Sequence, residues 1–372
     1  MDPSALMLSV AFQGERGAFS EAAVRAYFGP DAEPVPCPAF ADAFDRLVAG
    51  AVAAAMLPVE NSYAGDVGEV YDLLRRYPVR VRGELQLPVR HCLLALPGTR
   101  LGDLRAVRSH PQALAQCREF LHRHGLIAEP AYDTAAAARQ VAEAGRRDLA
   151  AIASHQAAVH YGLEVLAEDI QDSAGNVTRF FHLERAVPGD EPAPAAAGPR
   201  KGGQRAEPAA PTPAAARPAA PVPTGAAPAS LAPAAPLAAR LPGQGGPSTQ
   251  GPQVNPQGPL AGPQRPQASL PLVPEASPRL VPVGVKTSLL FVGEDRPGAL
   301  YRCLGAFARR EINLTKLTAR PERGGSWQYM FFADLEGSLD EPRVQAAVEE
   351  LRRQATYVRV MGSYGVWQAL DR

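Results

Sequence analysis

The sequence is poor in the features that mark several classes of protein. Its 372 residues include only four cysteines, and no two of them lie close together in the chain. This spacing argues against a zinc site or a disulfide framework and suits a reducing compartment. Acidic and basic residues number 38 each, so no excess charge points to nucleic acid or to an anionic membrane surface. No apolar run approaches the ~20 residues that a membrane-spanning helix needs.

The N-terminal stretch MDPSALMLSVAFQG has no basic segment and runs directly into a strand pattern. It therefore does not read as a signal peptide. A soluble cytoplasmic protein is the expectation.

Residues 188–282 hold about two dozen of the 38 prolines, almost no aromatic residues and no periodic apolar pattern. Such a segment cannot bury enough apolar surface to offset the entropy lost on ordering. We predict a disordered, partly polyproline-like linker, with a Pro-rich ligand for a partner as the alternative reading. The linker separates an N-terminal region, 7–187, from a C-terminal region, 283–372.

The N-terminal region alternates strand and helix signals, which is typical of an α/β protein with mostly parallel sheets. Residues 52–57 form a fully apolar run, as expected for a strand buried on both faces. Glu60 and Asn61 follow this strand, where ligands bind in open α/β sheets, although a plain strand-end turn is the alternative. The chain is extended from 80 to 96, which predicts two α/β lobes with crossings near residues 85 and 165 and a cleft between them.

Three polar residues, Ser109, Gln112 and Gln116, are spaced so that they share one face of a helix near its N-terminus. Ser109 could instead serve only as a cap, and Gln116 could be solvated. His110 and His155 resemble acid–base residues, but both precede helices, which also fits local caps or packing.

The stretch NVTRFFHL, residues 176–183, reads as a strand because it is rich in β-branched and aromatic residues. It places a hydroxyl, Thr178, next to a guanidinium, Arg179, and the two could offer a proton donor and a cation to an anionic ligand. An edge strand with both side chains solvated is the alternative.

The C-terminal region follows the order β-α-β-β-α-β, which predicts a ferredoxin-like fold of the size of a small ligand-sensing module. Gly298 opens its first helix, so that a ligand could approach the backbone closely near a helix N-terminus.

Ordered motifs along both regions resemble one known architecture. The N-terminal region resembles the catalytic domain of prephenate dehydratase, and the C-terminal region resembles an ACT domain of the phenylalanine-sensing kind. The resemblance rests on AFQGERGAFSEAA (11–23), LPVENSYAG (57–65), SHPQALAQC (109–117), YGLEVLAEDIQD (161–172), NVTRFFHL (176–183) and RPGALYRCLGAFARREINLTKL (296–317). It implies a two-lobed fold like that of periplasmic binding proteins plus the ferredoxin-like ACT domain, assembled as a homodimer or homotetramer.

The resemblance also implies the reaction, in which prephenate becomes phenylpyruvate, carbon dioxide and water on the way to L-phenylalanine. Because the ring becomes aromatic, the elimination needs no metal or cofactor. The site residues implied by the motifs are Glu60, Asn61, Ser109, Gln116, Thr178, Arg179 and Phe180. Thr178 would donate to the departing hydroxyl, Arg179 would anchor a carboxylate, and Phe180 would form a wall. Glu60 fits less well, because a carboxylate repels a dianion unless it is protonated or turned away.

In the ACT-like region the resemblance implies effector binding by Gly298, Ala299, Leu300 and Arg320. The family usually has Glu-Ser-Arg-Pro where this chain has Thr318-Ala319-Arg320-Pro321, so a carboxylate and a hydroxyl are missing. We expect L-phenylalanine to inhibit the full-length protein but not a 1–187 fragment. Two alternatives remain: an arogenate dehydratase, and a non-catalytic amino-acid or anion sensor, against which the intact Thr-Arg-Phe triplet argues.

Overall fold

The structure is a computed structural model that describes residues 8–173, 175–187, 278–321 and 329–370. The predicted linker lies almost wholly outside these residues, but a strand begins at Arg279, inside the range predicted as linker.

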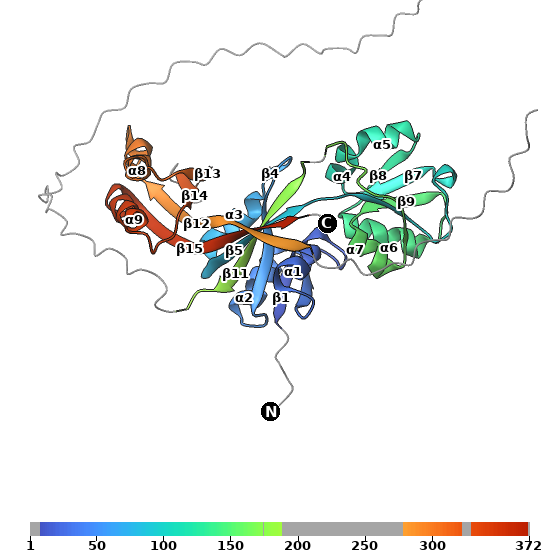
Figure 1. Cartoon of the computed structure of the whole chain (residues 1–372), viewed down its shortest axis with the longest axis horizontal. Coiled ribbons are helices and arrows are strands. Elements are labelled where there is room, and N and C mark those ends of the chain that lie inside the picture. The colour runs from blue at the N-terminus through green and yellow to red at the C-terminus, as the bar shows by residue number, and fades with distance from the viewer. Residues whose placement is uncertain (1–7, 174, 188–277, 322–328, 371–372) are drawn as a thin grey trace, which may run out of the picture. The chain divides into compact units, whose positions relative to one another are not determined.

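The elements follow one another in the order labelled in Figure 1. In the N-terminal region they are β1 (Ser9–Gln13), α1 (Phe19–Phe28), β2 (Glu33–Cys37), α2 (Phe40–Val48), β3 (Ala54–Asn61), β4 (Gly65–Asp66), α3 (Gly68–Arg76), β5 (Val79–Pro88), β6 (Cys92–Ala95), a short 3-10 helix (Leu101–Asp103), β7 (Ala106–Ser109), α4 (Pro111–Gln116), α5 (Arg118–Arg123), β8 (Ile127–Pro130), α6 (Thr134–Ala144), β9 (Leu149–Ala153), α7 (His155–Tyr161), β10 (Glu164–Ala167) and β11 (Val177–Arg185). The C-terminal region contains β12 (Arg279–Gly293), α8 (Ala299–Ala308), β13 (Leu314–Pro321), β14 (Tyr329–Glu336), α9 (Pro342–Gln354) and β15 (Ala355–Leu370).

The mixed α/β fold is confirmed. One sheet of the N-terminal region contains β5, β11, β3, β1 and β2 in that order, and a second sheet contains β10, β6, β9, β7 and β8. The chain passes from the first sheet to the second between β5 and β6 and returns between β10 and β11. These crossings lie a few residues beyond the predicted positions, and the backbone N–H of Val89 on one donates to the carbonyl of Asn176 on the other (2.8 Å).

Each sheet of the N-terminal region has its own core. In the first sheet the predicted apolar strand is buried on both faces, with Met56 and Leu57 fully inaccessible. In the second sheet every residue of β9 is buried, and alanines of α6 and α7 pack on it. Small side chains let these helices lie close to the strand.

The C-terminal strands form the predicted ferredoxin-like arrangement, with the sheet order β13-β14-β12-β15. The last strand, β15, is 16 residues long. Its far end runs parallel to β5, with Gly365 opposite Gly83 and Gln368 opposite Gln86 (Figure 1). The ACT-like strands therefore continue the first sheet of the N-terminal region into one ten-stranded sheet.

Candidate active site

A cavity of about 280 Å³ is lined by residues from both sheets of the N-terminal region. Among the residues implied by the motifs, Asn61, Gln116, Thr178 and Phe180 line it. Glu60, Ser109 and Arg179 are not among its lining residues. Four of the seven implied site residues thus meet in one place.

Thr178 is buried and lies near the start of β11, opposite Asn61 on β3. Asn61 Nδ2 donates to Thr178 Oγ1 (2.9 Å). The amide of Asn61 is fixed because its Oδ1 accepts from the backbone N–H groups of Tyr63 (3.1 Å) and Ala64 (3.0 Å). Since the hydroxyl oxygen of Thr178 already accepts a bond, its own proton is available for a ligand in the cavity.

The bond to Thr178 belongs to a longer chain of amides. Asn61 Nδ2 also donates to Asn176 Oδ1 (2.7 Å), and Asn176 Nδ2 donates to Gln116 Oε1 (3.0 Å). His91 Nε2 lies 2.8 Å from the same oxygen of Gln116 and must carry a proton to bond to it. With its oxygen used twice, Gln116 is left with its NH₂ group as the donor toward the cavity it lines.

His91 is 2 % exposed and lines the cavity. Burial lowers the pKa of His91, and the hydrogen bond to Gln116 opposes this only in part. The imidazole is therefore neutral near pH 7 with its proton on Nε2, while its buried Nδ1 has no partner among the described residues. It serves as the neutral end of the amide chain.

Neither His91 nor Asn176 was predicted. Asn176 begins the motif NVTRFFHL, so its position beside the strand was a usable signal. His91 lies in the apolar stretch around β6, where a single histidine carries no pattern that marks it as functional.

Arg179 faces away from the cavity, because neighbouring residues of a strand point to opposite faces. Its Nη1 lies 2.6 Å from Glu60, and its Nε and Nη2 bond both oxygens of Glu84 (3.0 and 2.7 Å). Nη2 also bonds Asp334 of the ACT-like region (2.7 Å). The structure thus places Glu60 and Arg179 together but does not bring them to the cavity with Thr178.

Ser109 is fully buried at the end of β7, and its hydroxyl donates to the carbonyl of Ile152 (2.6 Å). The cap of α4 is His110 instead, whose Nδ1 accepts from the backbone N–H of Gln112 (3.2 Å). Both His110 and Gln112 line the cavity. His155 opens α7 as the sequence indicated, but the cap there is Ser154.

The charges that line the cavity are few. None of the described lining residues is an arginine or a lysine, and two, Asp66 and Asp133, are acidic. Burial raises the pKa of Asp133, whose Oδ1 caps α6 through the N–H of Ala136 (2.6 Å). Burial also acts to raise the pKa of Asp66, but hydrogen bonds from Lys316 and Thr318 outweigh it and lower the pKa.

In the ACT-like region Gly298 caps α8 with a left-handed backbone (φ 75°), as its role at the helix opening requires. Ala299 is buried and Leu300 is half-buried on that helix. Arg320 lies elsewhere, on β13, where it bonds both oxygens of Asp72 on α3 (3.2 and 3.1 Å). The implied effector residues are thus divided between a helix N-terminus and a contact with the N-terminal region.

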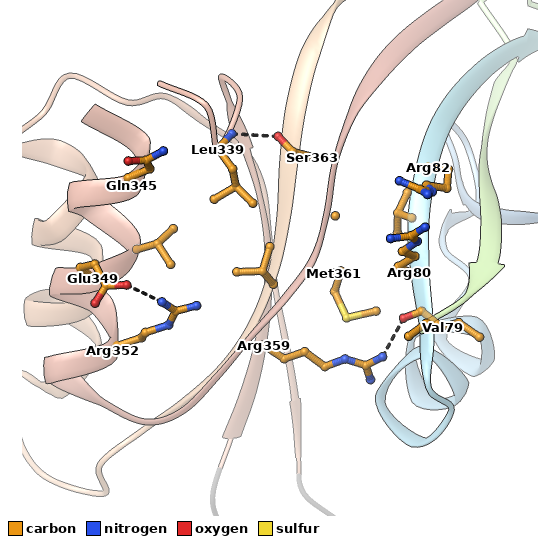
Figure 2. A pocket seen from close by; sticks show the side chains of 15 residues that line it. Val79, Arg80, Arg82, Leu339, Gln345, Glu349, Arg352, Arg359, Met361 and Ser363 are labelled. Carbon is orange, nitrogen blue, oxygen red and sulfur yellow. Dashed lines mark hydrogen bonds and ion pairs between the residues drawn. The ribbon is translucent and has the colours of Figure 1, made fainter. Parts of the chain in front are cut away.

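A larger cavity, of about 520 Å³, lies between β5 and the ACT-like α9 and β15 (Figure 2). It contains none of the implied site residues. Arg359 crosses its floor and donates to the carbonyls of Leu74 (3.2 Å), Tyr77 (3.1 Å) and Val79 (2.6 Å) at the end of α3. Arg359 thus joins the two regions, whereas Arg82 pairs with Glu184 and Arg352 with Glu349, each within its own region. Because none of the implied site residues lines this cavity, the smaller cavity is the candidate active site.

No group of three or more His, Cys, Asp or Glu side chains placed to hold a metal ion occurs in the part of the chain that the structure describes. The four cysteines are free and buried. None of the described helices is long and apolar enough to cross a membrane.

Comparison with solved structures supports the fold. The chain is similar to a protein described as "GqqA- a novel type of quorum quenching acylases", with 29% identity and a TM-score of 0.67, over 96% of this chain and 98% of that one. It is also similar to prephenate dehydratase from Arthrobacter aurescens, solved in complex with L-Phe, with 27% identity and a TM-score of 0.65, over 96% and 89% of the two chains.

Comparison with sequences gives the family. The family model described as prephenate dehydratase matches residues 10–187, and the ACT domain model matches residues 287–353. The chain is 36% identical to arogenate dehydratase/prephenate dehydratase 2, chloroplastic, of Arabidopsis thaliana over 96% of its own length and 72% of that protein. It is 35% identical to arogenate dehydratase 2 of Petunia hybrida, over 96% and 71%. The chain belongs to the prephenate dehydratase family, with a C-terminal ACT domain.

Proposed function

We propose that the protein is a prephenate dehydratase that converts prephenate to phenylpyruvate, carbon dioxide and water in L-phenylalanine biosynthesis. The observation that carries the proposal is the bond from Asn61 Nδ2 to Thr178 Oγ1, which leaves the hydroxyl proton of Thr178 for a ligand. The family and the ACT domain support the same activity.

Thr178 acts on the hydroxyl that leaves the prephenate ring. A hydrogen bond to this oxygen stabilises the negative charge that develops there, and one such donor is worth about 3 kcal/mol. A threonine hydroxyl is too weakly acidic to transfer its proton completely at neutral pH, so its contribution is hydrogen bonding. Phe180 lies two residues further along the strand, on the same face, and forms an apolar wall of the cavity.

The two carboxylates of prephenate meet hydrogen-bond donors at a cavity whose described lining has no arginine or lysine. The NH₂ group of Gln116 and the imidazole of His110 are available at the cavity. The N-terminus of α1 also opens onto it through Phe19 and Ser20, and no side chain caps that end. Helix N-terminal amides favour carboxylates without placing a full positive charge beside them.

Arogenate is the alternative substrate, since several relatives are named for it. It differs from prephenate in carrying an ammonium group where prephenate has a keto oxygen. Donors such as Gln116 suit the keto oxygen, whereas Asp66 and Asp133 at the cavity would suit the ammonium group. We propose prephenate and treat the turnover of arogenate as the competing outcome.

An acylase activity, which the name of one structural neighbour gives for that protein, needs a nucleophile activated by a base. In the described part of the chain Thr178 Oγ1 is bonded by the amide of Asn61, which is not a base. A non-catalytic sensor would have no use for a free hydroxyl proton held in place by an amide chain. The geometry therefore supports the elimination better than it supports an acylase or a non-catalytic sensor.

Regulation is proposed to come from L-phenylalanine at the ACT domain. The ACT match and the L-Phe complex of the Arthrobacter relative support this effector. Gly298, Ala299 and Leu300 at the start of α8 remain the proposed contacts, with Arg320 as a residue that joins the ACT domain to α3. A homodimer or homotetramer in the cytoplasm remains the expectation, although the Arabidopsis relative is named as chloroplastic.

The test is incubation of the purified protein with prephenate and with arogenate, in parallel. We expect phenylpyruvate from prephenate, detected by its enolate absorbance, and a lower kcat/KM for arogenate, whose product, L-phenylalanine, is measured by chromatography. Thr178→Ala should remove most of the activity. If the wild-type protein forms no product from either substrate, the proposed function is wrong; if only arogenate reacts, the substrate is wrong.

A further inference from the structure

Seven charged side chains form an ion cluster where the N-terminal region meets the ACT domain. Three are cations and four are carboxylates, and every one has a partner of opposite charge within 3.0 Å. The members are Glu60, Asp66, Glu84, Arg179, Lys286, Lys316 and Asp334.

Arg179 is the centre of this ion cluster. It is the residue after Thr178, and its guanidinium bonds Glu60, Glu84 and Asp334 at once. The side chain of Glu84 is fully inaccessible, and those of Asp334 and Arg179 are 7 % and 14 % exposed. Burial alone would raise the pKa of Glu84, but Arg179 outweighs it and the pKa is lowered, so the carboxylate stays charged.

The ACT domain holds its part of the ion cluster firmly. Asp334 lies on β14, and its second oxygen accepts from Ser288 Oγ of β12 (2.6 Å). Ser288 Oγ in turn lies 2.5 Å from the hydroxyl of Tyr364 on β15. Three ACT strands therefore fix the carboxylate that reaches Arg179.

The ion cluster and the candidate active site lie on opposite faces of the same pair of strands, β3 and β11. On β3 and β11, Asn61 is opposite Thr178 and Glu60 is opposite Arg179. The first pair is bonded on the cavity face and the second is bonded on the ACT face. One peptide unit of each strand separates the two pairs, so a shift of Arg179 and Glu60 moves Thr178 and Asn61.

A second link runs through Asp66. This residue lines the cavity and accepts hydrogen bonds from Lys316 and Thr318 of the ACT strand β13. Lys316 also contacts Glu60 (3.0 Å). The ACT domain thus contacts residues on both sides of Asn61 in the chain.

We propose that Arg179 is a positioning residue that ties the Thr178–Asn61 pair to Asp334, so that the ACT domain controls the placement of the donor hydroxyl through the ion cluster. This inference rests on the proposed function for the reaction that it affects, but not for the linkage itself. A buried ion pair cannot be pulled apart without leaving an uncompensated charge, so the strands follow one another rather than separate. Signals from an effector bound to the ACT domain would reach Thr178 by this route.

The test compares Asp334→Asn with Asp72→Asn in the full-length protein. Asp334→Asn removes the charge that Arg179 meets in the ACT domain while Glu60 and Glu84 still bind the guanidinium. Asp72→Asn breaks another contact between the ACT domain and the N-terminal region, the one with Arg320. Ser288→Ala is a milder third variant, because it releases Asp334 without changing any charge. Thermal melting checks that each variant is folded.

Two measurements are made on each variant: hydrogen–deuterium exchange of peptides that contain Asn61 or Thr178, and kcat and KM for prephenate. We expect Asp334→Asn to raise exchange in both peptides and to lower kcat about 2- to 30-fold with little change in KM. Ser288→Ala should act in the same direction but less, and Asp72→Asn should do neither.

Unchanged exchange in Asp334→Asn, or equal changes in Asp334→Asn and Asp72→Asn, would overturn the proposal. The exchange measurement needs no substrate. A protein inactive toward prephenate therefore counts against the proposed function alone, and the exchange result still decides the linkage.

Discussion

The replacement Asn61→Asp changes one NH₂ group into an oxygen and tests the role of Thr178 most directly. The backbone N–H groups of Tyr63 and Ala64 that bond Asn61 Oδ1 can bond a carboxylate oxygen equally well, so the turn after β3 is kept. The second oxygen then faces Thr178 Oγ1 and Asn176 Oδ1, to which Asn61 Nδ2 now donates from 2.9 and 2.7 Å, so the Asn176 amide must turn its NH₂ group toward the new oxygen. Because a carboxylate can only accept, the threonine hydroxyl turns its proton toward it and away from the cavity.

The size of the effect follows from the loss of one donor to the departing oxygen. Such a donor contributes about 3 kcal/mol, which corresponds to a fall in kcat of about 10²- to 10³-fold. Thr178→Val removes the same donor while keeping the shape of the side chain. The double variant should therefore be hardly slower than either single variant, because the two changes act on one proton.

A new negative charge in the cavity would also repel a dianionic substrate, so a charge control is needed. Gln13→Glu adds a carboxylate of nearly the same shape to the same cavity, and in the described part of the chain the Gln13 side chain bonds neither Asn61 nor Thr178. We expect it to raise KM more than it lowers kcat, whereas Asn61→Asp lowers kcat itself. Rates are measured as phenylpyruvate formation at saturating prephenate.

Two results would contradict this reasoning. If Asn61→Asp lowered kcat no more than Gln13→Glu, the orientation of the hydroxyl would have no part in catalysis. If the losses in Asn61→Asp and Thr178→Val multiplied in the double variant, the two residues would act independently.

Three further predictions concern stability. Burial lowers the pKa of His182 to about 4, so the unfolded chain binds the proton more readily than the folded one. The free energy of unfolding therefore falls as the pH is lowered from about 6.5 to about 4. From urea titrations, the fall in the free energy of unfolding between pH 7 and pH 5 should be about 2 kcal/mol larger in the wild type than in His182→Gln. Ser109→Ala should lower the free energy of unfolding by about 1 kcal/mol and leave kcat unchanged, because among the described residues the partner of its hydroxyl is the core carbonyl of Ile152. A large loss of kcat would refute this. Gly362→Ala should lower the melting temperature, since a Cβ atom there would clash with the carbonyl oxygen of Val81; an unchanged melting temperature would show that the strands can separate there.

The parts of the fold that depend on local pattern were predictable. The apolar strand β3 and its polar end follow from the run of small and aliphatic residues, and the helix opening at Gly298 follows from the glycine. The sequence led us to expect crossings near residues 85 and 165, and in the structure the chain changes sheets between β5 and β6 and between β10 and β11. Thr178 and Asn61 were both expected at the site, and the cavity brings them together.

The parts that depend on long-range pairing were not predictable. The far end of β15 pairs with β5, and nothing in the local sequence of β15 indicates this partner. The acceptor for Ser109 lies on a strand 43 residues away, which no spacing near the serine reveals. His91 bonds Gln116, 25 residues further along the chain, and no pattern around His91 indicates this contact.

Thr178 and Arg179 are adjacent, and the motif alone therefore suggests that the charge of Arg179 lies at the site beside Thr178. The two side chains point to opposite faces, and the one that faces the candidate site is neutral. This arrangement suits the chemistry of the proposed elimination. A guanidinium bound to the ring carboxylate would stabilise the ground state, where the negative charge is on the carboxylate, more than the transition state, where that charge has moved into the ring. Amide donors and a helix N-terminus bind the same anion more weakly. In the proposed reaction the carboxylate can therefore leave as carbon dioxide while Thr178 donates a hydrogen bond to the departing hydroxyl. Arg179, the arginine of the motif, instead bonds Asp334 of the ACT domain. The two adjacent residues can have different roles because successive side chains of a strand point to opposite faces of the sheet.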